Sequence, residues 1–415
     1  MNEPNKKEQQ IKKIIIEVIN KKGGSLKRED IYSDIEQQVN ASKLTETYKS
    51  IESYRSTVRS CISKLKEEGY LKQFNFLEIT LKGRELLSAS AFKLETEPSF
   101  QKIYQDIRFK GLRIDERTLR RYHLALKTRK FVILSGISGT GKTWLTKAYA
   151  DAIDAEHLPV PVAPNWTTNE DLLGYLNPIT DKAYHHTDFS RFLEKAETEY
   201  KQAQEEQRTP KPYHLVLDEM NLARVEYYFA KFLSAMEVRM RGEVAQIELA
   251  PDRQVLLPPN LYFIGTVNMD ETTHGFADKV YDRAQLIELE VARKDLDEHL
   301  GEVPYREILM NIWDSVHAVA PFAFRVLDEI KAYVEEAEKL KEAESSERLD
   351  DVREEALDEQ LLQKILPKLK GADDRVGVAL KAFLDIVNDK DFPLSHKKAT
   401  NMLDTFNQHG FTSYF

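Results

Sequence analysis

The chain has 415 residues, of which 41% are hydrophobic and 31% are charged, and its formal net charge is −9. This apolar content can build a core, which excludes a largely disordered chain. No apolar run approaches the roughly 18 residues that a membrane helix needs, and a single cysteine, Cys61, excludes an intrachain disulfide. We therefore expect a cytoplasmic protein of roughly two to three domains that does not engage a membrane.

Charge is unevenly distributed along the chain. Residues 1–90 contain 17 Lys and Arg against 13 Asp and Glu, whereas the remainder is acidic. A basic segment ahead of an acidic body indicates that any contact with nucleic acid lies in the first ninety residues.

The first ninety residues show the order of elements of a winged helix-turn-helix. Apolar spacing and turn residues predict three helices, a hairpin and a closing helix, with Ser25 as the cap of the second helix. The predicted ranges are 8–22, 25–39, 53–68, 70–74, 77–81 and 82–88. The segment 69–84 resembles the winged domain at the front of Mrr-type restriction proteins. A winged domain that docks a protein instead of DNA is the alternative.

The third predicted helix would be the DNA-reading element of such a domain. Its spacing allows Val58, Ile62 and Leu65 to face the core. Arg55 and Arg59 are then left outward, and we expect them to contact DNA. Cys61 is expected to be a small buried core residue.

A phosphate-binding loop directly follows the apolar strand predicted over 131–134. The loop has the pattern G-x-x-x-x-G-K-T and leads into a predicted helix over 144–153. Its backbone N–H groups and the helix N-terminus can hold a triphosphate, Lys142 adds a cation at the β- and γ-phosphates, and the Thr143 hydroxyl ligates Mg²⁺. The expected nucleotide-binding residues are Gly136, Ile137, Ser138, Gly139, Thr140, Gly141, Lys142, Thr143 and Asp218.

Two carboxylates end the next recognisable strand, 213–217. Asp218 is expected to hold Mg²⁺ through water. Glu219 is expected to orient and activate the attacking water. A helix cap is the structural alternative for such a pair.

A third strand, 261–267, ends at Asn268. Its amide is expected between the sites of the other two strands, where it can hydrogen-bond the γ-phosphate and the water, as a sensor-1 residue does. Arg283 follows a predicted short helix and can act as an arginine finger on the γ-phosphate of a neighbouring subunit. A salt bridge with Asp282 is the alternative.

The alternation of strands and helices from residue 130 predicts a parallel α/β sheet, and the chain from 295 onward reads as helical. Residues 201–212 are expected as a polar loop, and 331–360 as a charged helical hairpin.

With these residues in place, the chain resembles AAA+ NTPases of the McrB type over about residues 100–415. The stretches that carry the resemblance are the phosphate-binding loop, 164–175, 217–229, 265–274 and 279–284. The resemblance implies a hexameric ring with nucleotide between subunits and an McrC-like nuclease partner. The best-known member hydrolyses GTP and reads Asn-Thr-Ala-Asp where this chain reads Asn268-Met269-Asp270-Glu271, so GTP and ATP both stay open.

The expected fold is an α/β AAA+ P-loop core with an all-helical lid, preceded by a small winged helix-turn-helix domain. The domains are 1–90 for DNA binding, 91–125 as a helical connector, 126–294 as the nucleotide-binding core and 295–415 as the lid. Arg325, Lys368 and Lys370 are the candidates for a sensor-2 cation.

The expected function is Mg²⁺-dependent NTP hydrolysis by a ring that binds DNA and drives the nuclease in antiphage restriction. The alternatives are a winged-helix DNA-binding regulator with a nucleotide-gated switch and a MoxR-like chaperone ATPase.

Overall fold

The computed structural model describes most of the chain from residue 97 onward and parts of the segment before it. The described residues are 11–12, 14–16, 18–19, 25–26, 51–67, 71–73, 77–79, 97–177, 184–250, 253–269, 274–344 and 349–415. The chain divides into two compact units, one of 1–97 with 195–211 and 238–245 and the other of the remaining residues. Within the described ranges, no helix is long and apolar enough to cross a membrane.

The first unit contains helix α3 and a small antiparallel sheet. Helix α3, Ile51–Glu67, buries Val58, Ile62 and Leu65, as its spacing predicts, and it also buries Cys61. The sheet has the order β1-β3-β2, from Ser25–Leu26, Leu77–Ile79 and Leu71–Gln73.

The hairpin of the first unit is confirmed, whereas Ser25 is a correction. Ser25 pairs with Glu78 of β3 and lies in a strand rather than capping a helix, because backbone pairing with β3 outweighs the local capping preference. The remainder of the predicted helix 25–39, the helix 82–88 and the side chain of Arg55 lie outside the described residues. The winged-helix domain therefore stays a prediction.

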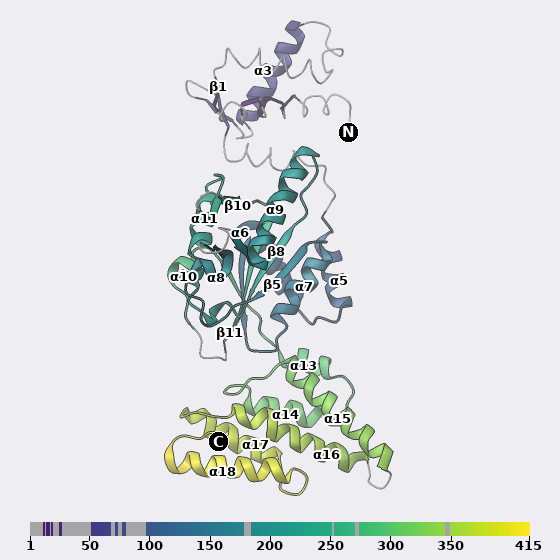
Figure 1. The fold of residues 1–415 in the computed structure, drawn as a ribbon. Coiled ribbons are helices and arrows are strands. Elements are labelled where there is room, and N and C mark those ends of the chain that lie inside the picture. Colours follow the sequence, from purple (N-terminus) through teal and green to yellow (C-terminus); the bar gives the residue numbers. More distant parts are fainter. Residues whose placement is uncertain are drawn as a thin grey trace. The chain divides into compact units, whose positions relative to one another are not determined.

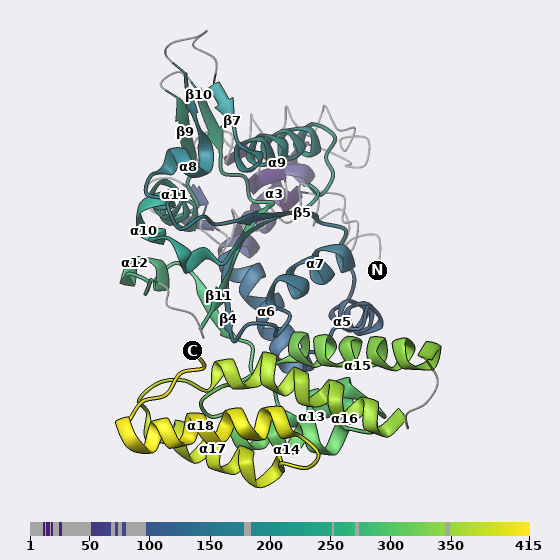
Figure 2. The same ribbon diagram turned by 60° about the horizontal axis from the view of Figure 1, so that its bottom comes forward.

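A five-stranded parallel sheet forms the centre of the second unit (Figures 1 and 2). Its order is β12-β4-β11-β8-β5, with all four pairings parallel. The strands are β4 Phe131–Gly136, β5 Glu156–Pro161, β8 Tyr213–Asp218, β11 Leu261–Asn268 and β12 Gln285–Glu288. In this order β11 lies between β4 and β8, so the ends of the three predicted strands meet at one edge of the sheet.

Side chains alternate between the two faces of this sheet. Val132, Leu134 and Ile264 belong to the core that three helices cover. These helices are α5 Phe100–Phe109, α6 Glu116–Arg129 and α7 Lys142–Ala152. Phe131 and Phe263 contact aromatic side chains of the opposite layer. Both faces are therefore covered, which explains the continuous apolar runs of these strands.

Helices α5 and α7 lie on one side of the sheet and α10 and α11 on the other (Figures 1 and 2). The segment expected as a connector contributes α5 and α6 to this layer. The polar loop expected over 201–212 is partly wrong, because α9 continues through Glu205. The bounds are α5 Phe100–Phe109, α6 Glu116–Arg129, α7 Lys142–Ala152, α8 Asn169–Leu173, α9 Asp188–Glu205, α10 Val225–Tyr228, α11 Ala230–Met240 and α12 Asp278–Tyr281.

Two antiparallel hairpins accompany the sheet. The strands are β6 Gly174–Leu176 with β7 Tyr184–His186, and β9 Gln246–Ala250 with β10 Arg253–Leu256. Neither hairpin was predicted from the sequence.

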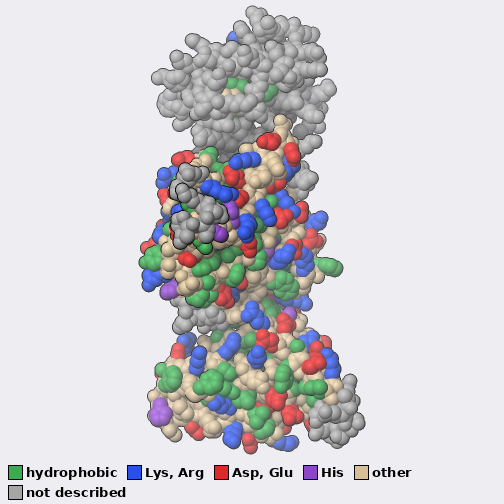
Figure 3. Space-filling model, in the orientation of Figure 1, with side chains coloured by type: hydrophobic (Ala, Val, Ile, Leu, Met, Phe, Trp, Pro, Cys, Tyr) green, Lys and Arg blue, Asp and Glu red, His purple; other side chains and the backbone are tan. Residues whose placement is uncertain are grey.

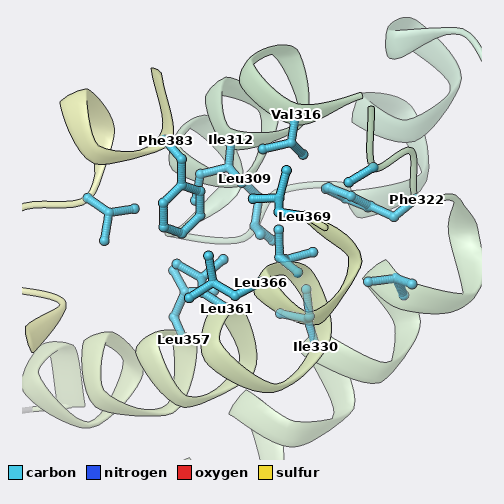
Figure 4. Packing of buried hydrophobic residues seen from close by; sticks show 14 of the residues in the cluster. Leu309, Ile312, Val316, Phe322, Ile330, Leu357, Leu361, Leu366, Leu369 and Phe383 are labelled. Atoms are coloured by element: carbon cyan, nitrogen blue, oxygen red, sulfur yellow. The ribbon is translucent and has the colours of Figure 1, made fainter. Parts of the chain in front are cut away.

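The C-terminal region is helical, as expected, and has its own apolar core (Figure 4). Leu309, Ile312, Leu357, Leu361 and Phe383 meet there from four segments of the chain. The helices are α13 Arg293–Leu300, α14 Arg306–Val316, α15 Phe324–Glu344, α16 Leu349–Gln360, α17 Asp374–Ile386 and α18 Pro393–His409. Helices α15 and α16 form the charged hairpin predicted over 331–360. We call this region the lid.

Figure 3 shows acidic and basic side chains interspersed on the visible face of the described part. That face presents no uniformly basic patch among the side chains that are described.

Candidate nucleotide-binding site

The phosphate-binding loop connects β4 to α7 and depends on two glycines. Gly136 has φ 149° and Gly139 has φ 83°, backbone angles that L side chains rarely adopt. A Cβ on Gly136 would lie 2.7 Å from the Leu289 carbonyl oxygen, and one on Gly139 would lie 2.8 Å from Cβ of Arg325. The loop therefore packs closely against the lid helix α15, and a side chain at residue 139 would separate the two.

Lys142 and Thr140 place buried polar groups in this loop. Nζ of Lys142 donates to the carbonyl oxygens of Gly136 at 2.9 Å and Ile137 at 2.7 Å, so the ammonium lies inside the loop. Thr140 is 5% exposed, and its hydroxyl has no hydrogen-bond partner among the described residues. A buried hydroxyl without a partner is costly unless a ligand satisfies it. Both groups suit the binding of an anion.

Asp218 at the end of β8 accepts hydrogen bonds from two hydroxyls. Oγ1 of Thr143 donates to Oδ1 of Asp218 at 2.7 Å, and Oγ1 of Thr266 donates to the same oxygen at 2.6 Å. Thr143 comes from the first turn of α7 and Thr266 from β11. The structure thus joins the loop, β8 and β11 through one carboxylate oxygen.

Glu219 follows directly and is held at both its backbone and its carboxylate. Its backbone lies in the left-handed region with φ 53° and ψ 46°, and its N–H donates to Oγ1 of Thr266 at 2.9 Å. Nδ2 of Asn268 donates to Oε1 of Glu219 at 3.0 Å. The amide predicted as a sensor therefore contacts the carboxylate predicted to activate water.

Six of these residues border one cavity of about 500 Å³, a size typical of ligand sites: Lys142, Thr143, Asp218, Glu219, Thr266 and Asn268. It is lined by the loop, the ends of β8 and β11, a segment before α6 and the first turns of α15. The residues are Gly111, Leu112, Arg113, Gly139, Gly141, Lys142, Thr143, Trp144, Asp218, Glu219, Thr266, Asn268, His299, Phe324, Arg325, Asp328, Glu329 and Ala332.

Among the three lid cations considered from the sequence, Arg325 lines this cavity. Its Nη1 donates to Oγ of Ser138 at 3.3 Å. The geometry therefore selects Arg325 as the lid cation beside the phosphate-binding loop.

Arg283 lies apart from these groups and is held by its own subunit. Nη2 contacts Oε2 of Glu237 at 2.5 Å, and Nε and Nη1 donate to the carbonyl oxygens of Leu233 and Lys279, each at 2.9 Å. Its ion pair is thus with Glu237, and the alternative from the sequence had named Asp282.

The predicted DNA contacts belong to the other compact unit. Arg59 is exposed on α3, consistent with its outward placement. The sequence reasoning missed Thr266, although it stands two residues before Asn268 and therefore shares its face of β11. It also missed the segment Gly111–Arg113, which carries no distinctive local pattern.

Comparisons with known proteins bear on this site. Residues 131–284 match the family model of the AAA domain (dynein-related subfamily), and residues 284–411 match a domain of unknown function (DUF8727). No curated protein matches the chain.

Solved structures of RuvB from Thermotoga maritima are similar. The Holliday junction branch migration motor is 15% identical, with 71% of this chain and 76% of that chain covered and a TM-score of 0.35. A point mutant of it is 14% identical, with 72% and 77% covered and a TM-score of 0.39.

The family match agrees with the strand order, with the loop between β4 and α7 and with the carboxylates at the end of β8. Residues 131–284 therefore have the fold of an AAA+ P-loop domain.

Proposed function

We propose that the chain hydrolyses ATP or GTP with Mg²⁺, using the cavity between the phosphate-binding loop and the lid. The observation that carries this proposal is the chain of hydrogen bonds from Thr143 through Asp218 and Thr266 to Glu219 and Asn268. It places the proposed metal-binding residues beside the proposed base. A loop that only bound nucleotide would not require the contact between Asn268 and the Glu219 carboxylate.

The residues present fit Mg²⁺. The Thr143 hydroxyl, at the start of α7, and the Asp218 carboxylate, at the end of β8, are hard oxygen donors 2.7 Å apart. Mg²⁺ commonly takes its other ligands from substrate phosphates and water. When bound, Mg²⁺ would neutralise charge that develops on the phosphates.

Residues of the chain itself bind the phosphates, accept the proton and stabilise the developing charge. Lys142 and the backbone N–H groups of the loop hold the β- and γ-phosphates. Glu219 accepts a proton from the water that attacks the γ-phosphorus, and Asn268 holds that carboxylate in place. The bond from the γ-phosphorus to the bridging oxygen breaks, which leaves the diphosphate and inorganic phosphate. Arg325 adds positive charge from the lid side.

The wider role rests on the resemblance to McrB-type proteins. We place the chain in a hexameric ring in which Arg283 of one subunit serves the nucleotide of its neighbour. Residues 1–90 bind DNA through Arg55 and Arg59, because this segment carries 17 Lys and Arg against 13 Asp and Glu. The ring drives a separate McrC-like nuclease in antiphage restriction in the cytoplasm.

The test is hydrolysis of ATP and GTP side by side, with and without duplex DNA. Glu219→Gln should lower kcat by about 10²–10⁴-fold, because the amide cannot accept the proton. Glu354→Gln, an exposed residue of α16, should match wild type. Replacing Arg55 and Arg59 by Ala should remove stimulation by DNA and leave basal hydrolysis intact. Undiminished hydrolysis by Glu219→Gln would disprove the catalytic assignment.

A further inference from the structure

Thr266 occupies the point where the two carboxylate residues of the site meet. It lies on β11 and is 1% exposed. Its hydroxyl donates its one proton to Oδ1 of Asp218 at 2.6 Å and accepts the N–H of Glu219 at 2.9 Å. One small group therefore bonds the side chain of one residue and the backbone of the next.

The bond to Glu219 restrains a backbone in an uncommon conformation. The pairing of β8 ends before Glu219, and this residue then adopts φ 53° and ψ 46°. A non-glycine residue keeps such angles only when its surroundings hold it there. The Thr266 hydroxyl provides part of that restraint, because it satisfies an N–H that the ladder of the sheet no longer pairs.

The bond to Asp218 has the corresponding effect on the other carboxylate. Thr143 and Thr266 donate to the same oxygen, from opposite elements, and so fix the rotation of the Asp218 side chain. Asn268, on the same face of β11, donates to the Glu219 carboxylate. The strand β11 thus orients both acids through two residues, one of which the sequence motif does not include.

We propose that Thr266 is a positioning residue that fixes Asp218 and Glu219 relative to each other for hydrolysis. This inference rests on the proposed function of the same site. The role needs a donor and an acceptor in one compact group. Valine has the shape of threonine but neither a hydrogen-bond donor nor an acceptor in its side chain, whereas serine keeps both. A purely structural role would need only the shape of the side chain.

The experiment compares wild type with Thr266→Val and Thr266→Ser in the full-length chain. Steady-state hydrolysis of the preferred triphosphate should show kcat lowered roughly 10–100-fold in the valine variant, with KM changed less than about 3-fold. The serine variant should recover kcat to within about 5-fold of wild type. Thr405→Val, on an exposed part of α18, is the matched control and should behave as wild type.

A second measurement does not depend on turnover. Calorimetry with ADP, with and without Mg²⁺, gives the gain in affinity that the metal provides. Thr266→Val should lose most of that gain, and Thr266→Ser should keep it, because the orientation of Asp218 requires the hydroxyl. A valine variant with wild-type kcat and an undiminished Mg²⁺ gain would overturn the proposal, as would a serine variant no better than valine.

These outcomes separate the two claims. If wild type hydrolysed neither triphosphate, the proposed function would fail, and the Mg²⁺ gain would still decide whether Thr266 orients Asp218. If wild type hydrolysed and the valine variant matched it, only the role of Thr266 would fail.

Discussion

His214 lies on β8, in the strand that ends at Asp218, and is almost completely buried. Its ring stacks on Tyr149 with centroids 5.9 Å apart and lies 5.1 Å from the ring of Tyr262. Burial lowers the pKa of His214 to about 3, with smaller contributions in the same direction from His157 and Lys127. The folded protein therefore keeps this ring neutral.

We expect His214 to make the folded protein sensitive to acid. In the unfolded chain its pKa returns to about 6.5, so between that value and about 3 the unfolded state binds more protons and falling pH destabilises the fold. Between pH 7 and pH 5, wild type should lose about 2 kcal/mol more unfolding free energy than His214→Phe. Urea unfolding at both pH values measures this. His409→Gln, which is exposed, should follow wild type, and equal losses in wild type and His214→Phe would refute the assignment.

Residues that belong to a recognisable local motif could be predicted from the sequence, and a residue outside such a motif could not. Lys142, Asp218 and Asn268 each close a local pattern, and the structure brings them to one cavity. Thr266 contacts a residue 47 positions away, and Arg325 contacts Ser138 from 187 positions away. Thr266 was not predicted, and Arg325 was one of three candidate lid cations, so the packing of β11 and of the lid distinguishes these two.

The N-cap residue of helix α18 provides no side-chain hydrogen bond to the first turn of the helix. Its N-cap position, Phe392, has no side-chain acceptor. Asp358 of α16 takes over this role: Oδ2 accepts the N–H of Leu394 and Oδ1 accepts the N–H of Ser395, both at 2.8 Å. Asp358 is 2% exposed, so these two bonds satisfy side-chain oxygens that are shielded from water.

Loss of this cap should destabilise the lid. Asp358→Ala leaves the N–H groups of Leu394 and Ser395, the second of them buried, without their acceptor and should cost about 1–3 kcal/mol of unfolding free energy. Asp358→Asn keeps one acceptor but turns an NH₂ group toward the other donor, so it should recover only part of the loss. Asp351→Ala, exposed on the same helix, should cost under about 0.5 kcal/mol. Urea unfolding and amide exchange in α18 measure the effect, and wild-type stability in Asp358→Ala would contradict it.

Elements with a strong hydrophobic periodicity could be predicted from the sequence. Elements whose structure depends on contacts with distant segments of the chain could not. The buried strands and the lid hairpin follow from apolar runs and helical spacing. Ser25 suggests a helix cap locally, but it pairs with β3. The polar residues after 200 suggest a loop, but α9 extends to Glu205 because its residues are good helix formers.

At the scale of the whole molecule, the cavity depends on the lid as much as on the AAA+ core. Arg325 and Phe324, from the first turn of α15, line the cavity together with the phosphate-binding loop. In the sequence, alternating strands and helices predicted the AAA+ core, and the helices that follow predicted the lid. The sequence could not show that the two meet at Gly139, where the close approach to Arg325 depends on the missing side chain.

The proposed ring predicts that one active site draws on two subunits. Arg283→Ala keeps the nucleotide pocket and Lys142→Ala keeps the arginine, so each variant alone should be inactive while a mixture recovers hydrolysis. In a ring of equal parts, an intact pocket meets an intact arginine at about a quarter of the interfaces, so about a quarter of wild-type activity is expected. Lys142→Ala mixed with Glu219→Gln should recover none, because every pocket is then damaged. Equal failure of both mixtures, or full activity of Arg283→Ala alone, would show that Arg283 does not act across a subunit interface and that its bond to Glu237 is its whole role.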